Sequence, residues 1–144
     1  MHPDQVFRAD YLATTYHASG LEICFSSTET GQVLFAGRRF ALITAQNPRS
    51  TPLDPDENFA LNEMMQTVLN AKGWTFGSSY GHNAELSWSE AGFIVWDVDL
   101  PDILTVARDF EQNAIMYGQG SGLALCWCFS GEIEWLYPSY IAKD

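Results

Sequence analysis

Polar side chains that could bind or transform a ligand gather at three separated places in this sequence. One is the run 44–50, Thr-Ala-Gln-Asn-Pro-Arg-Ser; the second is Glu90; and the third is the pair Gln112-Asn113. Amide side chains both donate and accept hydrogen bonds, while Arg49 adds a cation and Ser50 a hydroxyl group. Such a set suits a small polar ligand, and a partly buried carboxyl group can also act as a general acid or base.

A long amphipathic helix follows the first of these groups. Apolar residues at positions 61, 64, 65, 68 and 69 recur at the spacing that places them on one face of a helix. Asp54 provides an N-cap, Pro55 suits the first helical position, and Gly73 provides a stop. We predict a helix that begins between residues 54 and 58 and ends by residue 73. Its buried face carries Leu61, Met65 and Leu69.

A second helix and several short strands complete the pattern. This helix starts after the cap Asp99, has Pro101 in its first turn, and ends near Asn113. Its apolar face carries Ile103, Val106, Ala107 and Phe110. Apolar or alternating runs predict strands at 21–25, 40–45, 74–80, 93–98 and 114–117, and a hairpin of 123–129 with 133–137 that turns at Ser130-Gly131. Residues 5–16 are expected to be helical, and residues 81–90 to form a polar loop.

The order strand, helix, strand, strand, helix, strand predicts an α+β fold. It is typical of a two-layer, ferredoxin-like split βαβ core (βαββαβ) with both helices on one face of the sheet. The N-terminal and C-terminal strands would widen this sheet or cover its open face, which would explain why 93–98 is apolar on both sides. We expect a single domain over 1–144, with the core at about 40–118 and a C-terminal β-hairpin extension at 119–144.

Several motifs resemble a family of bacterial proteins known as domain of unknown function 3293. The hallmark is the run from Phe40 to Ser50. Further similarity lies at Tyr11 and Thr15-Tyr16, at Glu57-Asn58 and Asn62, at Trp88-Ser89-Glu90 with Phe93, and at Gln112-Asn113-Ala114 after Phe110. It covers most of the chain up to about Gly118. The residue before Gln112 is usually glycine in such sequences and is Glu111 here. The resemblance implies no particular activity.

In a split βαβ core the three polar groups would meet at one edge of the sheet, together with the first turns of the first helix. The candidate ligand-binding residues are Thr44, Asn47, Arg49, Ser50, Asn58, Asn62, His82, Glu90, Gln112 and Asn113. The leading hypothesis is a module that binds a small polar or anionic molecule, with Arg49 and the helix N-terminus holding an anion. A purely structural interpretation makes the same residues turns, caps and buried hydrogen-bonding groups.

Two other functions stay open at this point. One is a non-metal enzyme, such as a hydrolase, with Glu90 as acid or base and Ser50 or His82 assisting. The other is a protein-interaction domain, acting on a partner or in a homodimer through an exposed sheet face or the C-terminal hairpin. The three histidines are isolated and lack the spacing of HExxH or Cys/His motifs, so the sequence predicts no metal site and no cofactor.

Composition limits the partners and the compartment. Seven Lys and Arg against eighteen Asp and Glu give a formal charge of −11, which disfavours nucleic acid and anionic membrane surfaces. The start of the chain has no signal-peptide pattern and no run is long enough to span a membrane, so we expect a cytoplasmic protein with reduced cysteines. Cys126 and Cys128 should share one side of a strand with Ala124, beneath a helix.

Overall fold

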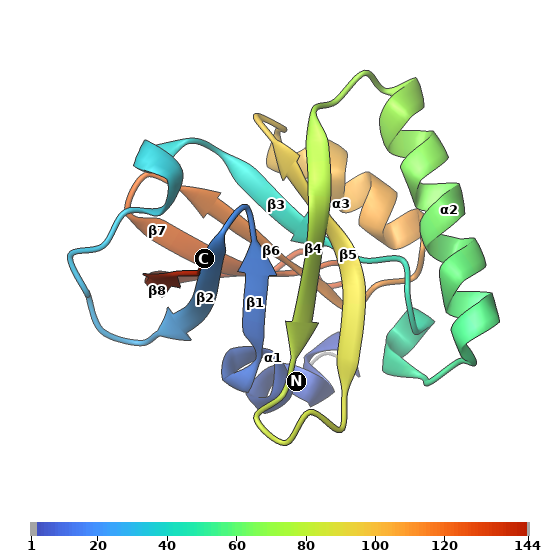
Figure 1. Cartoon of the computed structure of the whole chain (residues 1–144), viewed down its shortest axis with the longest axis horizontal. Coiled ribbons are helices and arrows are strands. Elements are labelled where there is room, and N and C mark those ends of the chain that lie inside the picture. Colours follow the sequence, from blue (N-terminus) through green and yellow to red (C-terminus); the bar gives the residue numbers. More distant parts are fainter. Residues whose placement is uncertain (1–2, 144) are drawn as a thin grey trace.

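The computed structural model describes residues 3–143, whose strands form a closed antiparallel barrel. The strands are β1 (Thr15–Ala18), β2 (Leu21–Ser26), β3 (Phe40–Ile43), β4 (Phe76–His82), β5 (Ser89–Trp96), β6 (Ala114–Gln119), β7 (Gly122–Trp127) and β8 (Ile133–Ala142). Around the barrel they follow the order β1-β2-β8-β7-β6-β3-β5-β4, and β4 pairs with β1 to close the circle (Figure 1).

The helices lie outside the barrel or at its ends. They are α1 (Arg8–Ala13), α2 (Pro55–Ala71) and α3 (Leu100–Asp109), with short 3-10 turns η1 (Pro3–Phe7), η2 (Leu34–Gly37) and η3 (Pro48–Ser50). Figure 1 shows α2 and α3 together on one side of the barrel and α1 near one end of β1. Within residues 3–143, no helix combines the length and the apolar composition that crossing a membrane requires.

Two hydrophobic cores lie on opposite faces of the same strands. Side chains alternate along a strand, so Phe40 and Leu42 of β3 point into the barrel while Ala41 and Ile43 point toward the helices. The outer core is completed by residues of α2 and α3, among them Met65 and Ile103. Both faces of β3 and of the middle of β5 are therefore covered, which explains the continuous apolar runs in these strands.

The expected two-layer, ferredoxin-like α+β fold is wrong, because the sheet closes into a barrel. The order β6-β3-β5-β4 is that of a split βαβ unit, but its two edge strands are not left open. The short strand β1, which the sequence pattern did not reveal, pairs with β4, and β7 pairs with β6. Strands β2 and β8 join these two sides, so the terminal segments close the sheet instead of widening or covering it.

The two main helices follow the predictions closely. Helix α2 begins at Pro55 behind the cap Asp54, whose side chain accepts a hydrogen bond from Glu57 N at 2.8 Å. It ends at Ala71, two residues before a left-handed Gly73, and it fully buries Met65 and Leu69, whereas Leu61 is half-buried. Helix α3 buries Ile103, Val106 and Ala107 as predicted, but it ends at Asp109 rather than near Asn113.

The C-terminal hairpin forms as β7 and β8, which are integral strands of the barrel. Ala124, Cys126 and Cys128 belong to the outer core against the helices, as predicted. The polar loop between β4 and β5 is shorter than expected, because both strands extend into it. As a result His82 and Glu90 belong to strands and not to a loop, and their side chains are held more rigidly than loop residues.

Candidate functional site

A cavity of about 610 Å³ opens at one end of the barrel, between α1 and the β4–β5 turn. Apolar walls come from interior residues such as Tyr16, Leu42 and Met116, and Trp88 contributes an aromatic side chain near the turn. Four of the predicted site residues contribute to its lining: Thr44, Ser50, Glu90 and Gln112. Mostly apolar walls with a few convergent polar groups are typical of a small-molecule site.

Asn47 lies at the centre of a buried hydrogen-bond network beside this cavity. Its side-chain nitrogen donates to Glu90 Oε2 at 2.8 Å, and its side-chain oxygen accepts from Leu53 N and from Asn58 Nδ2. Its backbone N–H donates to Asn58 Oδ1 at 2.8 Å. The network joins the loop after β3, the first turn of α2 and strand β5, so it fixes the position of the Glu90 carboxyl group.

A second set of side chains holds strand β5 next to Glu90. Strand β3 ends at Ile43, and beyond it side chains replace the backbone partners of Ala91. The Ala91 carbonyl accepts from Thr44 Oγ1 at 2.6 Å and from Asn62 Nδ2 at 3.0 Å, while Ala91 N donates to Gln46 Oε1. Thr44 and Asn62 therefore act as positioning residues that satisfy backbone groups at the end of the β3–β5 ladder.

The carboxyl group of Glu90 has an unusual protonation behaviour. Burial disfavours the charged form and raises its pKa from 4.5 to about 7, against a smaller lowering effect of the hydrogen bond from Asn47. Near neutral pH the group is therefore divided between its acid and its carboxylate forms. A group poised in this way can both donate and accept a proton at the cavity wall.

Gln112 and Asn113, just before β6, bind the loop that follows β3. Both side chains are buried, and Gln112 Nε2 donates to Gln46 O at 3.1 Å, while Asn113 Nδ2 donates to Ser50 Oγ at 3.0 Å. These bonds tie β6 to the loop after β3. The predicted meeting of Asn47, Glu90 and the pair 112–113 at one end of the sheet is therefore present in the structure.

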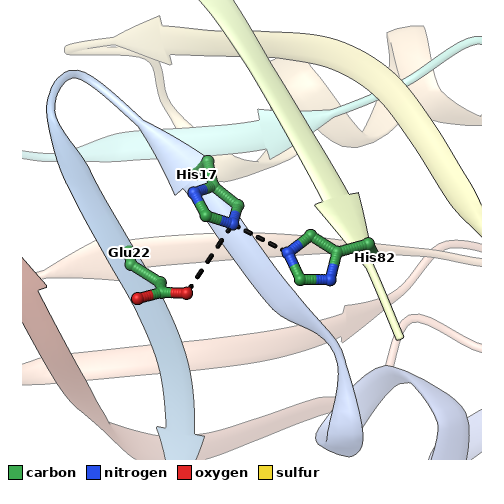
Figure 2. Close-up of side chains that lie close together, drawn as sticks. All are labelled: His17, Glu22 and His82. Atoms are coloured by element: carbon green, nitrogen blue, oxygen red, sulfur yellow. Dashed lines mark hydrogen bonds and ion pairs between the residues drawn. The ribbon is translucent and has the colours of Figure 1, made fainter. Parts of the chain in front are cut away.

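Two of the predicted residues, Arg49 and His82, belong neither to the cavity lining nor to the hydrogen-bond networks beside it. The exposed side chain of Arg49 stacks over the Phe129 ring at 3.7 Å and forms a long ion pair with Glu111 at 3.8 Å. His82 lies on the outer face of the barrel, where its Nε2 is 2.8 Å from Nε2 of His17 (Figure 2).

Tyr11 is a functional candidate that the site prediction left out. Its phenol lines the cavity, and its ring packs edge-on against Trp127 with the centroids 5.8 Å apart. Burial raises the pKa of Tyr11, a hydrogen bond with Ser50 opposes this, and the nearby Glu90 adds to the increase, so the phenol stays protonated. The available signal was its place among the family motifs.

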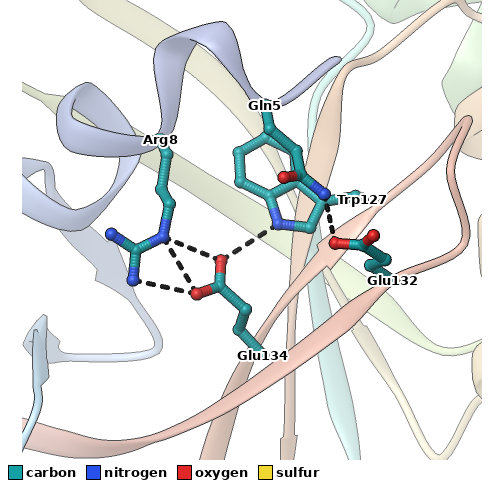
Figure 3. A network of polar contacts seen from close by, with 5 residues as sticks. All are labelled: Gln5, Arg8, Trp127, Glu132 and Glu134. Carbon is teal, nitrogen blue, oxygen red and sulfur yellow. Dashed lines mark hydrogen bonds and ion pairs between the residues drawn. The ribbon is translucent and has the colours of Figure 1, made fainter. Parts of the chain in front are cut away.

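A polar network anchors the segment that carries Tyr11. Arg8 binds both carboxylate oxygens of Glu134, at 2.9 and 3.1 Å from its Nε, and Trp127 Nε1 donates to Glu134 Oε2 at 3.1 Å (Figure 3). Gln5 donates to the Glu132 carboxylate in the same group. These contacts join η1 to the turn before β8 and α1 to β8, so the N-terminal segment is held across the end of the barrel.

The loop from Asn47 to Ser50 is strained. Asn47, Arg49 and Ser50 all have positive φ angles of 49 to 60°, a left-handed conformation that costs side-chain-bearing residues roughly 1 to 2 kcal/mol each. A contact with the segment that follows α3 holds this loop in place, since Arg49 N donates to Glu111 O at 2.8 Å. Strain of this kind is characteristic of binding and catalytic loops.

Glu111 also has a positive φ, of 54°, and the surrounding bonds show a helix end at which glycine would be favoured. Glu111 N bonds to Arg108 O and Gln112 N bonds to Ala107 O, which is the Schellman arrangement at the end of α3. Glycine adopts the required conformation without steric cost. The glutamate keeps the same bonds at the expense of strain.

Glu111→Gly should therefore raise the free energy of unfolding by about 0.5 to 1 kcal/mol, because it relieves a left-handed side chain. Urea denaturation measures the change. Glu111→Ala is the matched control, since it removes the same carboxylate but keeps the strain, and it should change the stability by less than about 0.5 kcal/mol. A destabilised glycine variant would contradict the strain argument.

The fold and the site together define a class: a small closed antiparallel β-barrel with a partly polar cavity at one end and two helices packed on its outside. A family model described as "Protein of unknown function (DUF3293)" matches residues 43–115, and the chain belongs to that family. The matched region contains the loop after β3, α2, Glu90 and the pair Gln112-Asn113. A search of curated proteins and a search of solved structures found no match to the chain.

Proposed function

We propose that the chain binds a small, polar, uncharged or cationic molecule in the cavity at the end of the barrel. The observation that carries this proposal is the Glu90 carboxyl group, half-buried in the cavity wall and held by Asn47 at 2.8 Å. A half-buried carboxyl group with capacity for further hydrogen bonds suits a ligand that offers an N–H or O–H donor. Trp88 and Tyr16 add aromatic surface for an apolar part of the same ligand.

The charges around the cavity favour this class over an anion. Among the described residues that line the cavity, Asp10, Glu85 and Glu90 are acidic and no Lys, Arg or His occurs. The cation that the sequence suggested for an anionic ligand, Arg49, is outside this lining. A carboxylate or phosphate would therefore meet repulsion at the cavity, whereas an amine, amide or hydroxyl group would find an acceptor.

The asparagines of α2 support the proposal indirectly. Asn58 and Asn62 use their amide groups on Asn47, Leu53, Ala45 and Ala91, so they hold the cavity wall and leave ligand contact to other residues. The ligand-contacting groups in this proposal are Glu90, Tyr11, Ser50 and Gln112, which come from four different parts of the chain.

Native mass spectrometry of the untagged protein, purified without denaturing steps, tests the proposal. We expect a small molecule to be retained by the natural protein and to be reduced in Glu90→Gln and Tyr11→Phe, which remove one cavity group each while preserving shape. Glu29→Gln is the control, since Glu29 is exposed and outside the cavity lining. Equal retention in all variants, or no binding of any compound from a panel of small amines, amides and sugars followed by NMR, would refute the proposal.

A second candidate function is proton transfer at Glu90. The favouring observation is its pKa of about 7, which is close to the value that suits a general acid or base at neutral pH. The hydroxyl groups of Tyr11 and Ser50 line the same cavity. If Glu90→Gln still binds the retained molecule but no longer converts it, Glu90 is a catalytic residue; if the natural protein leaves the molecule unchanged over many hours, binding alone is the function.

The raised pKa of Glu90 predicts a particular dependence of stability on pH. The folded protein binds this proton more tightly than the unfolded chain, so the stability contributed by the group is fully present below about pH 4.5 and is lost as pH rises to about 7. Glu90→Gln cannot ionise. Relative to the natural protein, its free energy of unfolding should therefore increase by about 1 to 3 kcal/mol between pH 4.5 and pH 8.

Denaturation at several pH values measures this difference. Glu134→Gln provides a contrast of opposite sign, because the hydrogen bond from Arg8 lowers the pKa of Glu134 and its contribution to stability is lost as pH falls. A pH-independent difference between Glu90→Gln and the natural protein would show that Glu90 titrates normally.

A further inference from the structure

Three side chains that are far apart in sequence converge on the outer face of the barrel, on the strands β2, β1 and β4. The pairing places His17 opposite Glu22 and one diagonal step from His82. Tyr16, Ala18 and Ile23 point into the barrel, so these three polar residues share the opposite face. Figure 2 shows the Glu22 carboxylate and the His82 ring both facing the same nitrogen of His17.

The distances between the possible ligand atoms are short. Nε2 of His17 lies 2.8 Å from Nε2 of His82 and 3.9 Å from Oε1 of Glu22, and all three atoms lie within 4.8 Å of one another. A tetrahedral zinc ion, with Zn–N bonds of 2.0–2.1 Å, separates its nitrogen ligands by roughly 3.3 Å. Shifts of the order of half an ångström in the two rings would bring both nitrogens to that separation.

The surroundings already orient the rings for this role. Nδ1 of His82 lies 3.0 Å from the carbonyl oxygen of Asn83, to which an Nδ1–H would donate, leaving the lone pair on Nε2. Metal-binding histidines typically donate their second ring N–H to such an acceptor. The His17 ring stacks on Tyr80, with centroids 4.2 Å apart and planes 5° apart, so its orientation is also restrained.

The strands that carry the three side chains and their partial burial both favour ion binding. His17 and Glu22 side chains are only 16% and 23% exposed, so water competes less strongly for an ion there than on an open surface. Ligands on paired strands are positioned more accurately than ligands on loops. A positive charge lies beside the cluster: Nζ of Lys143 is 3.5 Å from Glu22 Oε2, whereas Glu22 Oε1 is the oxygen that faces His17.

We propose that His17, His82 and Glu22 form a binding site for a divalent transition-metal ion of the zinc type. Two neutral imidazoles and one carboxylate are a common three-ligand set for zinc, and the fourth position is left to water or to an incoming group. The site lies on the outer face of the barrel and does not depend on the proposed function of the cavity.

Isothermal titration of the chelator-treated, untagged chain with Zn²⁺, and separately with Co²⁺, tests this site. We expect one ion per chain, a rise in the melting temperature, and NMR signals of His17 and His82 that shift together. His17→Ala, His82→Ala and Glu22→Gln should each weaken binding at least about tenfold. Lys143→Met should strengthen binding, because it removes a positive charge beside Glu22.

His2→Ala is the matched control, since it removes the third histidine of the chain and should leave the affinity unchanged. Melting curves of the metal-free variants, recorded first, establish that each variant folds. No binding by the natural protein, equal binding by the three ligand variants, or loss of binding in His2→Ala would each overturn the proposal. Loss confined to His17, His82 and Glu22 variants supports it, whatever the cavity binds.

Discussion

Replacing Met65 with alanine should lower the free energy of unfolding by about 2 to 5 kcal/mol. Met65 is completely buried between α2 and the outer face of the barrel, in the core that also contains Ile43 and Phe93. Truncation removes apolar surface from this core and leaves a cavity that rigid strands and helices fill only in part. Urea or guanidinium denaturation measures the loss.

The neighbouring residue provides a matched control. Met64 is also a methionine of α2, but its side chain is 59% exposed. Met64→Ala should therefore change the free energy of unfolding by less than about 0.5 kcal/mol. Since alanine favours helices slightly more than methionine does, both variants share the same small backbone effect. Similar losses for the two variants would mean that α2 packs on the barrel with a different face.

Replacing Asn47 with alanine should lower the free energy of unfolding by roughly 3 to 5 kcal/mol at pH 8, where Glu90 is mostly charged. The side chain makes three hydrogen bonds, to Glu90, Leu53 and Asn58. Neutral bonds of this kind contribute about 1 kcal/mol each, and a bond to a charged group contributes about 1.5 to 3 kcal/mol. Alanine also tolerates the left-handed backbone of position 47 less well than asparagine does.

Asn70→Ala is the control for this change, since Asn70 is an exposed asparagine in the last turn of α2 and should tolerate the substitution within about 0.5 kcal/mol. A double-mutant cycle of Asn47→Ala with Glu90→Ala should give a coupling of roughly 0.5 to 3 kcal/mol, because the two side chains are bonded directly. Gln112→Ala should couple more weakly to Glu90, since Gln112 bonds to Gln46 O. If the losses of stability caused by the two single substitutions simply add in the double variant, the two side chains do not belong to one shared network.

The network changes the interpretation of the amide-rich motif. Its residues were candidates for ligand contact as a group, but the structure separates them into two kinds. Asn47, Asn58 and Asn62 bond to one another, to Glu90 and to backbone groups, whereas Glu90 and Ser50 line the cavity. The motif therefore positions a short list of cavity groups, and substitutions in it should affect stability before they affect any ligand.

Local features of the sequence determined α2 with its cap Asp54, the position of α3 and the C-terminal hairpin, whereas Asp99 makes no side-chain capping bond at the start of α3. The stop at Gly73, the cap at Asp54 and the apolar face of α2 depend on residues within a few positions of each other, so their spacing alone was informative. The meeting of Asn47, Glu90 and Gln112 also followed from short connections, because the order β6-β3-β5-β4 brings the ends of these strands together.

Only the tertiary structure decided that the sheet closes. Closure depends on pairs such as Leu21 with Ala142 and Thr15 with His82, which join segments far apart in sequence, and an edge strand carries no local signal for the strand that it will meet. The same long-range pairing brings His17 to His82 and places Tyr11 over the cavity. The sequence therefore determined which side chains were available, whereas barrel closure determined which of them face a ligand, because side-chain neighbours across a sheet are set by strand pairing and not by distance along the chain.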